Sequence, residues 1–171
     1  MKLRRHQAEA SAVTERVITG EVNRIYISVT PGGGKSAIPG IIAEKLMGHV
    51  IDRILWVVPR NSLRDQGEAD FPDWSQYRIR AAGNEVDPCR GTAGYVTTYQ
   101  AIVADPERHR LTMGDGKRWA IILDEFHHVL DGGEWYQAID PLMQSAALTV
   151  LMSGTLARGD GQRIAWVPYD A

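Results

Sequence analysis

The sequence predicts an α/β fold of three layers, in which helices cover both faces of a mainly parallel central sheet. Apolar runs of strand length recur along the chain, at 25–29, 54–58, 119–123 and 147–152, and segments with helix signals lie between them. The run at 54–58 is continuously apolar rather than alternating, which is typical of a parallel strand that is buried on both faces. Strands that alternate with helices in this way indicate a parallel sheet.

The length and composition fit one soluble domain. With 171 residues the chain is long enough to bury a full core. A formal net charge of -2 argues against binding nucleic acid through bulk charge, but leaves room for a local basic surface. The single cysteine, Cys89, excludes an internal disulfide. Because we also find no signal sequence and no apolar run of membrane length, we expect a cytoplasmic protein without a membrane partner.

The first segment, 3–18, has apolar residues at helical spacing and predicts an amphipathic helix. Gln7 lies on this segment, upstream of a glycine-rich turn. A glutamine side chain can pair both its donor and its acceptor with the edge of adenine, which makes Gln7 a candidate for reading a base. A solvated helix face is the plain alternative.

A glycine-rich turn joins the first strand to the next helix, and it predicts a phosphate-binding loop. Glycines allow successive backbone N–H groups to turn toward one anion, and the helix N-terminus adds unpaired donors. A lysine there reaches the terminal phosphates, and a serine hydroxyl coordinates Mg²⁺, so a nucleoside triphosphate with Mg²⁺ is the expected ligand. A chance turn is the alternative, since Val29 replaces the first glycine of the usual pattern. The candidate binding residues are Pro31, Gly32, Gly33, Gly34, Lys35 and Ser36.

The helix after this loop is expected to extend to about Met47, where Gly48 supplies a stop. Pro39 lies just inside it. Proline removes one backbone donor, so we expect either a late helix start or a distorted first turn.

After the strand 54–58, Asn61 or Ser62 is expected to cap a further helix. Arg60 and Asn61 follow the carboxyl end of a parallel strand, where ligands bind in open α/β sheets. Phosphate contact and a solvated turn are the two open alternatives for them. Residues 71–81 predict an irregular stretch with a short strand.

Residues 94–100 predict a short strand that passes into a helix ending near Asp105, with Thr97 or Thr98 as the helix N-cap. Phosphate contact by the same hydroxyls is compatible with capping, since helix N-termini bind anions. The most basic window, from Arg108 to Arg118, contains glycines at 114 and 116, and we interpret it as a loop that carries solvated charge.

A buried strand, 119–123, leads directly into Asp124 and Glu125. Burying a carboxylate without a partner is costly, so an ion or a reacting water should lie at this strand end. Beside a phosphate loop, Asp124 would hold Mg²⁺ through its water shell. Glu125 would orient and deprotonate the water that attacks the γ-phosphate.

His127 and His128 also suggest metal ligation. Zinc sites need three or four ligands, and the remaining histidines and the cysteine show no ligand spacing, so we do not expect structural zinc. After a helix at 134–145 and the strand 147–152, Ser153 and Thr155 lie at a strand end. Their hydroxyls are candidates for hydrogen bonds to the Asp124 and His127 end of the neighbouring strand, with an ordinary turn as the alternative. A last short strand is expected within 163–169.

The order of these motifs resembles the first RecA-like motor domain of superfamily-two helicases and translocases. The resemblance is closest to the DExH branch, which includes restriction-enzyme motor subunits and phage helicases. Residues 32–36 match the first motif of this family, and 124–127 match its DExH box. Residues 59–66 and 98–100 are similar to its two nucleic-acid motifs, and 153–155 resemble its Ser-Ala-Thr coupling motif.

The resemblance implies a RecA-like P-loop NTPase domain over 1–171, with 159–171 as an exit segment toward a second lobe. It implies ATP and Mg²⁺ as cofactors, one nucleic-acid strand as a partner, with DNA favoured over RNA, and a bacterial or phage-infected cell as the setting. The second RecA-like lobe would be supplied in cis or in trans, so we expect this lobe alone to hydrolyse ATP slowly.

The resemblance also assigns roles to individual residues, and two rival functions remain open beside it. The rivals are another P-loop enzyme, such as a nucleotide kinase, and a non-catalytic regulatory module. The residues are Gln7 for adenine; Lys35, Asp124, Glu125 and His127 for catalysis; Ser36 and Asp124 for Mg²⁺; Arg60, Asn61 and Thr98 for the strand; and Ser153 and Thr155 for coupling.

Overall fold

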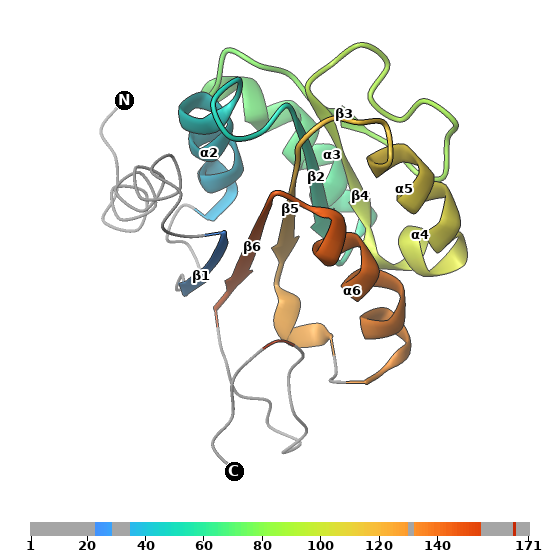
Figure 1. Ribbon diagram of the computed structural model, residues 1–171. Coiled ribbons are helices and arrows are strands. Elements are labelled where there is room, and N and C mark those ends of the chain that lie inside the picture. Colours follow the sequence, from blue (N-terminus) through green and yellow to red (C-terminus); the bar gives the residue numbers. More distant parts are fainter. Residues whose placement is uncertain (1–22, 29–34, 130–131, 155–165, 167–171) are drawn as a thin grey trace.

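The computed structural model describes residues 23–28, 35–129, 132–154 and 166 (Figure 1). In this part of the chain, strands in the order β1-β6-β5-β2-β4-β3 form one sheet in which every neighbouring pair is parallel. The predicted α/β fold with a mainly parallel sheet is confirmed. The strands are β1 (Arg24–Ser28), β2 (Arg53–Val58), β3 (Arg80–Ala81), β4 (Gly94–Thr98), β5 (Trp119–Asp124) and β6 (Leu148–Ser153).

Helices cover both faces of the sheet and give the three predicted layers (Figure 1). Strand β2 shows the division, because its successive side chains point to opposite faces. Trp56 packs with α2 and α3 in one apolar cluster, whereas Leu55 packs with α4, α5 and α6 in the other. The helices are α2 (Ile38–Leu46), α3 (Asn61–Asp70), α4 (Tyr99–Ala104), α5 (Pro106–Met113) and α6 (Glu134–Ser145).

The helix that follows the predicted phosphate loop in sequence begins late, which is one of the two expected arrangements. A 3₁₀ turn at Lys35–Ala37 precedes α2, so Pro39 lies in the first turn of the α-helix, where its missing N–H has no acceptor to lose. Gly48 has φ of 82° and ends the segment, as predicted. The predicted helix at 134–145 coincides with α6.

Two local predictions are wrong. The N-cap of α3 is Arg60, whose extended backbone precedes the helix, and neither Asn61 nor Ser62 caps it. The basic window is not a loop at its start, because Arg108 and its neighbours lie on α5. Asp105 caps this helix by accepting the backbone N–H of Arg108 at 3.2 Å, a signal that outweighs the nearby glycines.

Three predicted elements lie outside the described residues: the helix at 3–18, the glycine turn at 29–34, and the strand at 163–169 apart from Trp166. Within the described part of the chain, no helix is long and apolar enough to span a membrane.

Candidate active site

The polar residues that follow the strands gather at one edge of the sheet. Since all neighbouring strands are parallel, their carboxyl ends meet at the same edge, which is where ligands bind in this class of fold. The described strands end there in register. The pairs of opposite residues are Ser28 with Ser153, Asp124 with Met152, and Val58 with Thr98.

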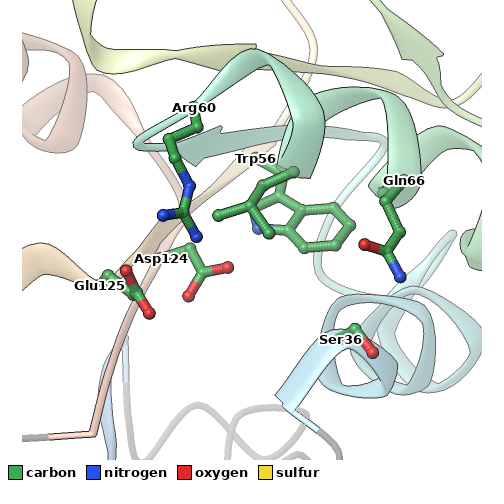
Figure 2. Close-up of a pocket in the computed structure, with 8 residues that line it drawn as sticks. Ser36, Trp56, Arg60, Gln66, Asp124 and Glu125 are labelled. Carbon is green, nitrogen blue, oxygen red and sulfur yellow. The ribbon is translucent and has the colours of Figure 1, made fainter.

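A pocket of about 150 Å³ lies at this edge (Figure 2). It brings Ser36, from the turn before α2, together with Asp124 and Glu125 at the end of β5. Ser36 is far in sequence from the two adjacent carboxylates, and the three residues were predicted to share a ligand. The pocket is lined by Ser36, Trp56, Arg60, Leu63, Gln66, Gly67, Asp124 and Glu125.

Asp124 is 5% exposed, and a buried tyrosine holds its backbone in place. The hydroxyl of Tyr99, at the start of α4, donates a hydrogen bond to the carbonyl oxygen of Asp124 at 2.8 Å. Burial raises the pKa of Tyr99 well above its ordinary value, so the hydroxyl keeps its proton. The Tyr99 ring stacks on Trp135 of α6 at a centroid distance of 4.8 Å. The end of β5 is therefore tied to both α4 and α6.

Glu125 adopts the left-handed conformation, with φ of 49°. This region is uncommon for residues other than glycine, and such strain gathers at functional sites. The turn ends β5 and starts the 3₁₀ turn Phe126–His128. One carboxylate oxygen of Glu125 lies 3.6 Å from Nε2 of His128.

His127 contacts the end of the neighbouring strand. Its Nδ1 lies 2.7 Å from Oγ of Ser153, the last residue of β6. This confirms the predicted hydrogen bond between the Ser153 hydroxyl and the His127 end of β5. Thr155, the other predicted coupling residue, lies outside the described residues.

The residues predicted to bind the nucleic-acid strand lie at or just after the ends of the neighbouring strands β2 and β4. Arg60 is exposed, and its guanidinium points toward Asp124 and Glu125 (Figure 2). Arg60 forms no ion pair within the described part of the chain. Asn61 is exposed on the first turn of α3. Thr98 is 5% exposed and caps α4 by accepting the N–H of Ala101 at 3.1 Å, so its predicted capping role is confirmed.

Sequence reasoning interpreted Trp56 as core packing, which its burial confirms, and gave Tyr99 no individual role. Trp56 is 2% exposed, and its indole N–H has no hydrogen-bond partner among the described residues. A buried donor of this kind usually binds water or a ligand oxygen. The signal for Trp56 was weak, because an indole inside an apolar run is normally core. Tyr99 follows Thr98 directly, but only the fold shows that its hydroxyl reaches β5.

Some predicted nucleotide-binding residues lie outside the described residues, namely Gln7, Pro31, Gly32, Gly33, Gly34 and the side chain of Lys35. The residues that are described fit a hard cation. A serine hydroxyl and carboxylate oxygens are the donors that Mg²⁺ prefers, and Ser36, Asp124 and Glu125 bring them into one pocket.

Comparison with known proteins identifies the family. Residues 1–158 match the family described as Type III restriction enzyme, res subunit. An uncharacterised protein of Mycobacterium leprae is 29% identical over 156 residues, which is 85% of this chain and 25% of that protein. The ATP-dependent DNA helicase Hel308 of Pyrococcus abyssi is 24% identical over 156 residues, 86% of this chain and 21% of that protein. The chain thus spans about a quarter of the length of these relatives.

Solved structures share the fold. The UvsW helicase of bacteriophage T4 has a TM-score of 0.69 at 22% identity, over 93% of this chain and 55% of that one. The Type ISP restriction-modification enzyme LlaGI, in complex with a DNA substrate mimic, has a TM-score of 0.68 at 18% identity. The match covers 97% of this chain and 18% of that one. The Sulfolobus solfataricus SWI2/SNF2 ATPase core, in complex with double-stranded DNA, has a TM-score of 0.69 at 15% identity. The match covers 97% of this chain and 34% of that one. This chain therefore belongs to the Type III restriction enzyme res-subunit family, and it has the RecA-like fold that these helicase structures share.

Proposed function

We propose that the chain is the ATP-binding lobe of an ATP-dependent nucleic-acid helicase or translocase, which binds ATP with Mg²⁺ and the backbone of one strand. The observation that carries the proposal is the shared pocket, in which Ser36 lies with Asp124 and Glu125. These side chains come from the start of α2 and the end of β5, and their oxygens suit a magnesium nucleotide.

Ser36 and Asp124 would hold Mg²⁺, and Lys35 would bind the terminal phosphates, with the turn at 31–34 around them and Gln7 on the adenine. Bound Mg²⁺ neutralises charge on the phosphate oxygens. The tie from Tyr99 fixes the backbone of Asp124, so this carboxylate is positioned before ligand arrives.

Glu125 is the base in this proposal and takes the proton of the attacking water. Its left-handed backbone turns the chain after β5, and its side chain lines the same pocket as that of Asp124. His127 contributes by linking this turn to the end of β6 through Ser153. Movement of the turn on hydrolysis would thereby reach the end of β6, and Thr155, which follows in sequence, would pass this movement on to a second lobe.

The nucleic-acid strand would bind along the ends of β2 and β4, through Arg60, Asn61 and Thr98. Arg60 belongs to both regions, since it lines the pocket and follows β2. Tyr99 gives a second link, because it follows Thr98 and bonds directly to Asp124. Two of the similar structures contain DNA or a DNA mimic, and one relative is named a DNA helicase, which supports DNA over RNA as the partner.

The test measures ATP binding and strand-stimulated hydrolysis in the purified protein together with its second lobe. Replacing Glu125→Gln should leave binding of a fluorescent ATP analogue unchanged and lower turnover by about 10² to 10⁴-fold, the usual contribution of a general base. Lys35→Ala should weaken the binding itself. Glu134→Gln, at the exposed start of α6, is the matched control and should change neither.

Other outcomes would favour the rival functions. ATP turnover that does not change when a nucleic-acid strand is added would indicate a different P-loop enzyme. Nucleotide binding that is unaffected by Lys35→Ala would contradict the proposed site and favour a non-catalytic module.

A further inference from the structure

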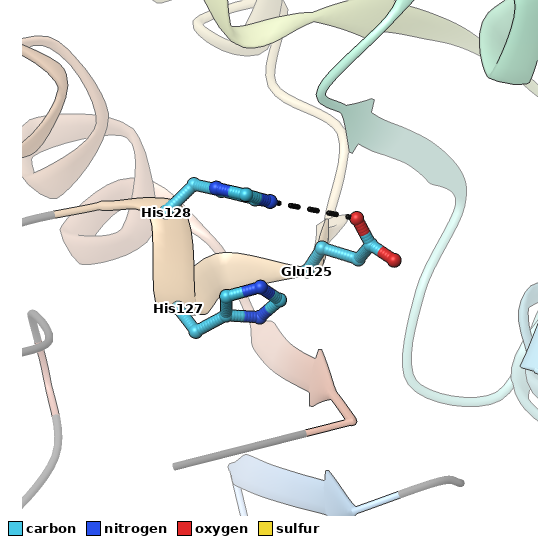
Figure 3. A group of neighbouring side chains, drawn as sticks. All are labelled: Glu125, His127 and His128. Atoms are coloured by element: carbon cyan, nitrogen blue, oxygen red, sulfur yellow. Dashed lines mark ion pairs between the residues drawn. The ribbon is translucent and has the colours of Figure 1, made fainter. Parts of the chain in front are cut away.

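Three metal-ligating side chains meet on the turn after β5. Glu125, His127 and His128 each offer one ligand atom, and these atoms all lie within 4.8 Å of one another (Figure 3). The backbone produces this cluster. The left-handed Glu125 reverses the chain, and two backbone hydrogen bonds close the turn. The N–H of His128 donates to the carbonyl oxygen of Glu125 at 3.1 Å, and the N–H of Val129 donates to the carbonyl oxygen of Phe126 at 2.8 Å.

The ligand set differs in chemistry from the proposed magnesium site. Two imidazole nitrogens and one carboxylate oxygen suit zinc, cobalt and nickel, whereas Mg²⁺ prefers oxygen ligands throughout. The separation of 3.6 Å between Nε2 of His128 and the carboxylate of Glu125 is close to the roughly 3.3 Å that bonds of about 2.0–2.1 Å require across a tetrahedral ion. Three protein ligands would leave a fourth position for water.

The surroundings also favour a metal. The Ser153 hydroxyl holds Nδ1 of His127 at 2.7 Å, so we assign Nε2 of this ring to the ion. Orientation of a ligating histidine through its other nitrogen is a regular feature of metal sites. The side chains of Glu125 and His128 are 30% and 46% exposed, so an ion can reach them from solvent.

We propose that Glu125, His127 and His128 bind a divalent transition-metal ion of the zinc type, and that this ion inhibits ATP hydrolysis. An ion held by the carboxylate of Glu125 would keep that group from accepting a proton from water. The binding site stands on the geometry of the three side chains alone, whereas the inhibition rests on the proposed function. His128 is the ligand that the catalytic proposal does not use.

Metal binding is tested first, without nucleotide. Titration of the full chain with Co²⁺ at neutral pH should give d–d absorption that saturates at one ion per chain. His128→Ala should weaken Co²⁺ binding at least about tenfold, the smaller effect seen when a supporting group of a metal site is lost. His49→Ala, an exposed histidine in the turn after α2, is the matched control and should bind as the unmodified chain does. Equal affinity of the unmodified and His128→Ala chains for Co²⁺ would overturn the proposal.

Inhibition is tested second, at saturating MgATP and with strand present. Micromolar Zn²⁺ should lower the turnover of the unmodified protein and of His49→Ala, and should affect His128→Ala much less. Equal inhibition of all three proteins would refute the regulatory role. A lack of ATP turnover in every protein would count against the proposed function only, because the Co²⁺ titration measures the site independently.

Discussion

Charged groups at the two ends of the sheet are arranged differently. At the amino end, Arg118 donates to Asp52 from its side chain at 3.0 and 3.1 Å and from its backbone N–H at 2.9 Å. The same guanidinium donates to the carbonyl oxygen of His49 at 3.0 Å. These hydrogen bonds from Arg118 lower the pKa of Asp52 to about 2. Arg118 and Asp52 therefore pair with each other at this end.

At the carboxyl end, charged and polar groups are arranged around a pocket instead. Asp124 is buried there, Glu125 has a strained backbone, and Arg60 is exposed without an ion pair among the described residues. The indole N–H of Trp56 adds a buried donor that no described residue accepts. We infer that the amino end stabilises the sheet and that the carboxyl end binds ligands. Changes at the first should cost stability, and changes at the second should cost binding.

The largest effect is expected at the amino end of β4, from Gly94→Ala. A Cβ at this position would lie 2.1 Å from the backbone oxygen of Ile54, so β2 and β4 would have to separate locally. Overpacking against backbone should lower the free energy of unfolding by about 3 kcal/mol or more, measured by urea denaturation.

The matched control is Gly83→Ala, because nothing lies within 4 Å of a Cβ added there. This variant should unfold at nearly the same urea concentration as the unmodified chain. Similar losses in both variants would show that the close approach of β2 and β4 does not limit stability.

A somewhat smaller effect is expected on acidification, from a buried histidine near the same end. His109 is 1% exposed, with Nδ1 2.7 Å from the hydroxyl of Tyr95 and Nε2 2.6 Å from Oδ1 of Asn84. Burial lowers the pKa of His109 to about 4, whereas in the unfolded chain it titrates near 6.5. Between these values the unfolded chain binds the extra proton, so stability is full above pH 6.5 and falls as the pH drops to 4.

The loss over this range should reach up to about 3 kcal/mol, followed by urea denaturation at fixed pH steps. His109→Gln removes the titrating group and should flatten the dependence, although it lowers stability at neutral pH. An unchanged slope in that variant would assign the acid sensitivity to other groups.

The smallest effect on stability is expected at the carboxyl end, from Arg60→Ala. Since Arg60 is exposed and unpaired among the described residues, its loss should change the free energy of unfolding by no more than about 0.5 kcal/mol. Binding of single-stranded DNA should weaken, and the slope of log affinity against log salt should fall by about 0.7, the value for one phosphate contact.

Arg110→Ala is the control for this experiment, because Arg110 is exposed on α5 and pairs with Glu107 of the same helix. It should leave the salt slope unchanged. An equal change of slope in both variants would indicate a general charge effect and would remove Arg60 from the strand interface.

Sequence reasoning succeeded where the signal was local. The continuous apolar runs predicted β2, β5 and β6, and the helix at 134–145 was predicted at its observed bounds. It failed at α5, where the cap from Asp105 outweighed glycines that suggested a loop. The expectation that His127 and His128 hold no structural zinc stays a prediction, and the Co²⁺ titration of the site proposed with Glu125 tests it.

The sequence alone determined that apolar strands alternate with helices and that two carboxylates come at the end of a buried strand, since buried strands leave runs of apolar residues in the chain. Only the tertiary structure decided which strand ends adjoin, and therefore that Ser36 shares a pocket with Asp124 and Glu125. It also decided that Tyr99 reaches β5 and that a left-handed turn gathers Glu125, His127 and His128. These contacts depend on strand order and backbone conformation, which apolar periodicity does not encode.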